Sequence, residues 1–474
     1  MTVASEAPSV GLVREALPQL AAVFAATLVA ISDGMLYGWT APVNPILLSP
    51  DSPVKTTQNQ ADWLETGLML GSFCGLPLTI YLVDKIGRKW CLLYASMSLV
   101  VVWIVIATAP SIIYILVVRI WAGNTGNMAF VAAPMYVAEI ADQKFRGFLS
   151  SLIYLMMLLG FVLIYSIAPF VPIWAHCIVG GALVALQLII FPFMPESPYF
   201  LLYKNKPEEA KKALKKLRPA GANIEKEIED IKLAVERQKT EKGRPQDLVM
   251  IPSNRKAIGI MALLNSAQHM SGISVMMMNL HYILQEAESI YMSASTSGIV
   301  FAVLMVIAAS IASATIDKYA RKTLLIISST LTGICLLTIA IYFSLKNSGY
   351  QVGGISWIPV VAVMLYALSF KSGLGLVPIV LTAELFPAKT KALGMTVADG
   401  FYVLGAIASL QVFQQLSKRY GMQYPFYVFA ASCFVAVVFT YFFIPETKGK
   451  TLEEIQQIVK GKYDEKRVNE RREA

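Results

Sequence analysis

The sequence has little charge and few residues that could form disulfides or bind metals. Asp, Glu, Lys and Arg make up only 15% of its 474 residues, whereas a soluble globular domain carries roughly 25% charged residues. Five cysteines in a chain of this length exclude a disulfide scaffold, and all five lie in apolar stretches typical of buried side chains. Three histidines offer no metal cluster. We therefore expect no metal, no cofactor and no surface built to face water on all sides.

ATP-driven or hydrolytic chemistry is also excluded. The segment Gly449-Lys450-Thr451 imitates the end of a phosphate-binding loop, but Ile444 stands where that loop requires a glycine and no strand precedes it. We do not expect an enzyme.

Long apolar stretches dominate what is present. Hydrophobic residues form 56% of the chain and the mean hydropathy is +0.58. A helix that crosses a bilayer needs about 20 apolar residues. Twelve stretches fit this length, near residues 19–42, 64–83, 90–108, 112–139, 148–170, 172–194, 256–286, 293–316, 323–345, 356–384, 392–416 and 424–444. The first is too long for a cleaved signal peptide. The sequence predicts an all-α membrane protein with twelve transmembrane helices.

The basic residues predict the orientation of these helices. If the N-terminus is cytoplasmic, only four of the 40 Lys and Arg residues lie in outer loops and two, Arg119 and Lys371, lie within spans. The other 34 fall on the cytoplasmic side, as the positive-inside rule requires. Both termini are therefore expected in the cytoplasm. The net charge of +9 then lies beside anionic lipid headgroups, so it does not indicate nucleic-acid binding.

Three landmarks recur in the same order along the chain. Asp84–Lys89 resembles Asp317–Lys322, Glu139 corresponds to Glu384, and the Pro-Glu pair at 195 recurs at 445. Each follows or closes an even-numbered span. The pattern predicts two six-helix halves in parallel repeat, which is typical of transporters that rock around a site at the midplane.

A polar segment rich in helix formers separates the halves. Pro207 favours the start of one helix and Asn223 the cap of the next. We expect this cytoplasmic helical linker to cover and couple the halves; a regulatory docking site is the alternative. The predicted parts are an N-terminal half at 1–194, a linker at 195–255, a C-terminal half at 256–444 and a cytoplasmic tail at 445–474.

Several motifs carry a family resemblance. The two Asp-Lys loops are joined by the segments Asp33–Trp39, Arg119–Gly123, Pro134–Ala141, Arg146–Gly147, Pro195–Tyr199, Glu384–Pro387 and Pro445–Glu454. With these the chain resembles the sugar porters of the major facilitator superfamily, and it is most similar to the arthropod facilitated trehalose and glucose transporters. The resemblance runs from the first span to the tail.

The resemblance implies an inner gate of charged side chains. In such transporters the gate is closed when the protein faces outward and open when it faces inward. The corresponding residues are Asp84, Arg88, Glu139, Arg146, Glu196, Asp317, Arg321, Glu384 and Glu446. The alternative is that these charges only anchor the topology.

The expected solute site departs from the pattern of the family. A sugar pocket needs side chains that both donate and accept hydrogen bonds, together with an aromatic face. Relatives carry Gln-Gln-x-Ser-Gly-x-Asn in the seventh span, of which only the first Gln is kept in Gln268–Ser274; the Trp of their tenth span is Ile379 here. The residues that could still line a polar pocket are Gln268, His269, Ser274, Asn279, Tyr154 and Trp39.

Charged residues within spans are costly and suggest function. Asp33 and Arg119 are candidates for an intramembrane pair, as in proton-coupled relatives, although Met35 occupies the symporters' acidic position. Lys371 and Asp399 are left without an assigned role; pairing or snorkelling toward water is as compatible with them as a substrate role.

The sequence thus predicts a plasma-membrane transporter that moves a small polar solute, most simply a sugar such as trehalose or a hexose, as a facilitative uniporter. The alternatives are a proton-coupled symporter and a solute sensor that transports nothing. The oligomeric state is left open.

Overall fold

The computed structural model describes residues 10–142, 146–219, 222–240, 246–386, 390–448, 450 and 452–460. Within these ranges the chain forms helices and no strand. It divides into two compact units, Met1–Thr240 and Glu241–Ala474.

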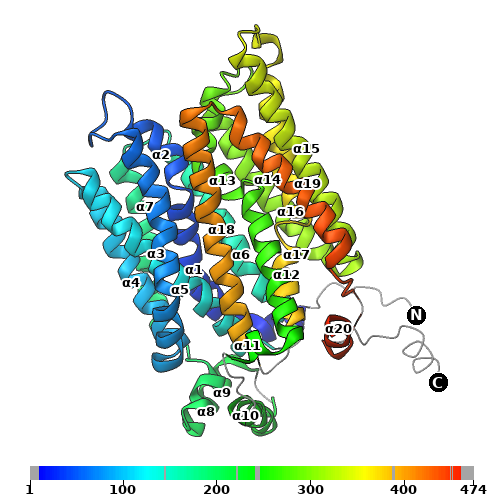
Figure 1. Ribbon diagram of the computed structural model, residues 1–474. Helices are drawn as coiled ribbons and strands as arrows, with labels where there is room; N and C mark the ends of the chain where they lie inside the picture. Colours follow the sequence, from blue (N-terminus) through cyan, green and yellow to red (C-terminus); the bar gives the residue numbers. More distant parts are fainter. Residues whose placement is uncertain are drawn as a thin grey trace. The chain divides into compact units, whose positions relative to one another are not determined.

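The first unit contains six long helices and three linker helices (Figure 1). The long helices are α1 (Val10–Gly38), α3 (Gln58–Ile86), α4 (Arg88–Thr108), α5 (Ile112–Ile140), α6 (Arg146–Ile167) and α7 (Ile173–Ile190), with the short α2 (Thr40–Leu47) after α1. The main packing pairs are α3 with α5, α1 with α6, and α4 with both α5 and α7. Small residues allow this close approach: a Cβ at Gly123 would overlap the Leu68 carbonyl, and one at Gly160 would overlap that of Ile31.

The second unit repeats this helical content. Its helices are α11 (Asp247–Met250), α12 (Pro252–Met270), α13 (Ile273–Glu286), α14 (Ala294–Thr315), α15 (Arg321–Asn347), α16 (Trp357–Ser372), α17 (Val377–Leu385), α18 (Lys391–Arg419), α19 (Gln423–Phe443) and α20 (Leu452–Val459). Helix α15 packs on α16 and α19, and α12 packs on α18.

Eleven helical segments of the described chain are long and apolar enough to cross a membrane. The predicted span at 256–286 is missing from these because it is broken into α12 and α13, with Gly272 between them at φ +81°. Glycine adopts this left-handed conformation without the steric cost other residues meet. The predicted spans at 19–42 and 356–384 are likewise interrupted, after Gly38 and after Ser372. With the broken segment counted, the prediction of an all-helical membrane protein with twelve spans is confirmed.

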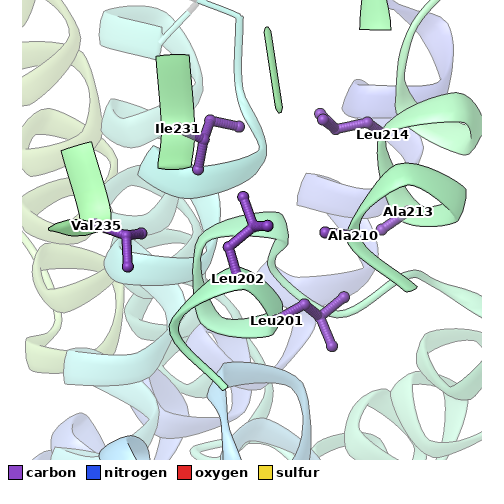
Figure 2. Packing of buried hydrophobic residues seen from close by; sticks show 7 residues of the cluster. All are labelled: Leu201, Leu202, Ala210, Ala213, Leu214, Ile231 and Val235. Carbon is purple, nitrogen blue, oxygen red and sulfur yellow. The ribbon is translucent and has the colours of Figure 1, made fainter. Parts of the chain in front are cut away.

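The linker helices α8 (Pro198–Tyr203), α9 (Pro207–Leu217) and α10 (Ile224–Thr240) belong to the first unit. Figure 2 shows Leu202 of α8 between the side chains of α10 and Ala210 of α9. The complete buried cluster is Leu201, Leu202, Ala210, Ala213, Leu214, Ile231 and Val235. The predicted caps are confirmed: Pro207 opens α9, and the Asn223 Oδ1 accepts a hydrogen bond from the Lys226 N–H at 3.1 Å. The linker therefore has a small hydrophobic core of its own.

Candidate functional site

A polar cluster lies at the break between α12 and α13. Gln268 and His269 end α12 and Ser274 lies in the first turn of α13. The Nδ1 of His269 is 2.8 Å from the Ser274 Oγ, so the hydrogen bond spans the break. Because Gly272 reverses the local backbone, two residues that belong to different helices can pair across it.

Two neighbouring segments of the same unit complete this cluster. The His269 ring meets the ring of Tyr402 on α18 edge to face, with centroids 4.1 Å apart. The Nε2 of Gln268 donates to the Gly375 carbonyl at 3.3 Å, in the break between α16 and α17. The Oε1 of Gln268 and the Nε2 of His269 are buried and accept or donate no hydrogen bond within the described residues. These two atoms are available to a polar solute, since buried polar groups are normally paired.

Tyr402 was not predicted as a site residue. It lies in the eleventh span outside every motif, and only the packing of α18 against α12 brings it to His269. Asn279 lies five residues beyond Ser274 on α13 and is buried.

The predicted aromatic and polar contributors of the first unit differ in exposure. Trp39 is fully buried, and its indole N–H donates to the Nε2 of His176 on α7 at 2.9 Å. The Arg119 guanidinium carbon lies 5.6 Å from the centroid of the Trp39 ring. Trp39 is therefore part of the core of this unit, whereas Tyr154 on α6 is half-buried.

At the linker end of the first unit, three residues of the predicted gate lie close together. The Arg88 Nη2 is 2.8 Å from the Glu139 Oε1, and the other Glu139 oxygen accepts a hydrogen bond from the Ser197 hydroxyl. The backbone N–H of Lys89 donates to both Glu196 oxygens, at 3.2 and 3.1 Å, so that this carboxylate caps the start of α4. Burial raises the pKa of Glu196 above its usual range, which makes these N–H donors important to its ionised form.

The second unit repeats the arrangement with a looser pair. The backbone N–H groups of Arg321 and Lys322 donate to the two oxygens of Glu446, at 3.0 and 3.1 Å. The Arg321 Nη2, however, lies 3.7 Å from the Glu384 Oε1. Thr447 occupies the position that corresponds to Ser197; its Oγ1 and the Glu384 Oε2 are buried without a hydrogen-bond partner in the described part of the chain.

The remaining predicted gate residues are not part of these two triads. Asp84 is exposed at the end of α3. The side chains of Arg146 and Asp317 lie outside the described residues.

The buried Arg119 is held by backbone atoms. Its Nε donates to the Leu64 carbonyl at 3.2 Å and its Nη1 donates to the Leu36 carbonyl. Among the described side chains, no ion pair joins Arg119 to Asp33, which lies where a Cβ on Gly126 would overlap it. A role for the two groups as a pair stays a prediction.

Lys371 and Asp399 differ in exposure. Lys371 is buried, with its ammonium 5.3 Å from the centroid of the Phe370 ring, whereas Asp399 is exposed on α18.

Comparison with known proteins decides the family. Residues 20–459 match the sugar (and other) transporter family. The chain belongs to this family. It is 28% identical over 443 residues to the facilitated trehalose transporter Tret1 of Polypedilum vanderplanki, covering 92% of this chain and 87% of the relative. It is 29% identical over 462 residues to the human solute carrier family 2, facilitated glucose transporter member 6, covering 92% and 90%.

Solved structures show the same fold. The inward open xylose transporter XylE from E. coli superimposes with a TM-score of 0.74 at 20% identity, covering 93% of this chain and 98% of XylE. XylE bound to 6-bromo-6-deoxy-D-glucose gives a TM-score of 0.69 at 23% identity, covering 92% and 98%. The chain is an integral, multi-pass membrane transporter with the major facilitator fold, not an enzyme.

Proposed function

We propose that this protein is a facilitative transporter of a sugar, trehalose or a hexose, that works by alternating access. The observation that carries the proposal is the family match over residues 20–459, together with relatives named as facilitated trehalose and glucose transporters that align over nine-tenths of the chain. We further propose that the linker and both termini face the cytoplasm and that the protein resides in the plasma membrane, as the distribution of basic residues favours.

The polar cluster of the second unit supports a sugar as the solute. Sugar hydroxyls donate and accept hydrogen bonds, and the unpaired Oε1 of Gln268 and Nε2 of His269 can satisfy them. The partly exposed Tyr402 ring beside His269 offers an apolar face for the pyranose ring. We assign Asn279 and Tyr154 to further solute contacts. Trp39 acts by packing behind the site, because it has no exposed surface.

The two triads at the linker end support an inner gate. Arg88, Glu139 and Glu196 in one unit and Arg321, Glu384 and Glu446 in the other form equivalent networks. An exposed ion pair contributes roughly 0.2–1 kcal/mol, and these pairs are largely buried. Several such pairs acting together shift a two-state equilibrium by the few kcal/mol that a population change requires.

Uniport is favoured over proton symport by the surroundings of Arg119. Its hydrogen bonds go to the carbonyls of Leu64 and Leu36, which do not titrate, so protonation of Asp33 has no direct ion pair to break among the described residues.

A labelled-solute panel tests the proposal. Purified protein in liposomes should take up trehalose or glucose saturably, with unlabelled sugar as competitor. Gln268→Ala should lower this uptake at least tenfold while the protein still folds, because it removes both the unpaired oxygen and the bond to Gly375. Uptake of an unrelated polar solute in place of both sugars would overturn the choice of substrate, and no flux of any solute would favour the sensor alternative.

A further inference from the structure

A single arginine joins the linker to the end of the fourth long helix. Arg218 directly follows α9, and its side chain is only 6% exposed. Its Nε lies 3.1 and 3.0 Å from the two oxygens of Glu227 in the first turn of α10, and its Nη2 lies 2.6 Å from the Glu227 Oε1. Its Nη1 donates to the Ile140 carbonyl at 2.9 Å. Ile140 is the last residue of α5.

The geometry of a guanidinium suits these two tasks. The planar group has donors on separate edges, so one edge can hold a carboxylate while the remaining nitrogen reaches a carbonyl. The Ile140 carbonyl is one of the last four of its helix, which have no partner within the helix, and a cation there is favoured by the helix dipole. A lysine has a single nitrogen and cannot maintain the same set of contacts.

The carbonyl that Arg218 holds is adjacent to a gate residue. Glu139 precedes Ile140 and accepts hydrogen bonds from both Arg88 and Ser197. Ser197 also accepts the Phe200 N–H, so that it caps α8 and links the gate carboxylate to the same linker core. The linker thus holds the last turn of α5 at two adjacent residues, Glu139 from α8 and Ile140 from Arg218.

We propose that Arg218 is a positioning residue of the transport cycle: by clamping the end of α5 to α10 it holds the Glu139 carboxylate in register with Arg88. This inference rests on the proposed function of Arg88 and Glu139 as gate residues. It assigns to the linker a direct part in setting the gate.

A second ion pair in the linker provides a matched control. Lys211 of α9 and Glu225 of α10 also form an ion pair between these helices, but their side chains are 33% and 70% exposed. Neither has a printed hydrogen bond to α5. Glu225→Gln therefore removes an α9–α10 pair without touching the gate, whereas Glu227→Gln weakens the clamp.

Hydrogen–deuterium exchange of the full-length protein in liposomes tests the clamp. Arg218→Lys and Glu227→Gln should raise amide exchange at residues 136–142 about tenfold, the change expected when a charge-assisted hydrogen bond is lost. Glu225→Gln should leave these amides unchanged. Exchange confined to α9 and α10 in the clamp variants would overturn the proposal, since it would mean that Arg218 only stabilises the linker.

Coupling to the gate is tested by combining variants. Arg218→Lys should change the sugar uptake rate several-fold in the otherwise unchanged protein but add little in the Arg88→Ala background, because both act through Glu139. Independent, additive effects would contradict the inference. If the unchanged protein transports no sugar, the proposed function fails, while the exchange experiment still decides whether Arg218 holds the end of α5.

Discussion

The hydroxyl of Ser197 donates to the carboxylate of Glu139, whereas the corresponding pair in the second unit, Thr447 and Glu384, is not bonded. The two units repeat the same motif but differ in how tightly it is closed. The Arg–Glu distances follow the same order, 2.8 Å in the first unit and 3.7 Å in the second.

This asymmetry predicts unequal costs for matched substitutions. Ser197→Ala should lower the free energy of unfolding by about 2 kcal/mol, because a hydrogen bond to a charged group is lost and a carboxylate oxygen is left unpaired. Thr447→Ala should cost about 1 kcal/mol or less, mainly from its buried methyl group. Thermal unfolding of both variants in the same detergent measures the difference, and equal losses would show that the two networks are equivalent.

The gate assignment predicts a change in accessibility. Arg88→Ala or Glu139→Ala should speed labelling of a cysteine introduced by Ser274→Cys from the cytoplasmic side several-fold, with Cys74 replaced by serine, because the gate loses its ion pair. The control is Glu209→Ala, which breaks an exposed pair with Lys206 in the linker. Unchanged labelling in both gate variants would leave these charges as topology anchors only.

The polar cluster predicts a gain in sugar affinity from two substitutions. His269→Gln combined with Ser274→Asn restores the pattern of the family in the seventh span and supplies amides that pair with each other and with sugar hydroxyls. One added hydrogen bond contributes roughly 0.5–1.5 kcal/mol, so binding of trehalose or glucose should strengthen several-fold. Competition against labelled sugar measures it. Weaker binding of both sugars would mean that the His269–Ser274 bond is itself part of the recognition.

The Trp39–His176 hydrogen bond predicts a structural role for both side chains. Trp39→Phe leaves the buried His176 Nε2 without its donor and should cost about 1–3 kcal/mol of stability. Adding His176→Leu should recover part of that cost, because the unpaired polar atom is removed. Unfolding in detergent gives the coupling between the two substitutions. Losses that simply add would show that the hydrogen bond contributes nothing.

Sequence reasoning succeeded where the signal is local. Hydrophobic length located the spans, and the repeated motifs placed Arg88, Glu139 and Glu196 together because each lies at the end of a span. The run at 256–286 is apolar throughout, so its length concealed the break that Gly272 makes in the backbone.

The contacts that could not be predicted join residues far apart in the chain. His176 lies 137 residues from Trp39, and Arg218 lies 78 residues from Ile140. Neither periodicity nor motif spacing indicates which side chains meet when helices pack. Tyr402 is a similar case, since nothing around it in the sequence marks it as a neighbour of His269.

The central claim is facilitative sugar transport, and its most direct test is the steady-state level of labelled sugar in proteoliposomes at equal pH and under an inward proton gradient. The account predicts that internal trehalose or glucose rises saturably to the external concentration and no further, at both conditions, with and without Asp33→Asn. Accumulation above the external concentration that is driven by inward protons and abolished by Asp33→Asn in a folded protein would contradict it.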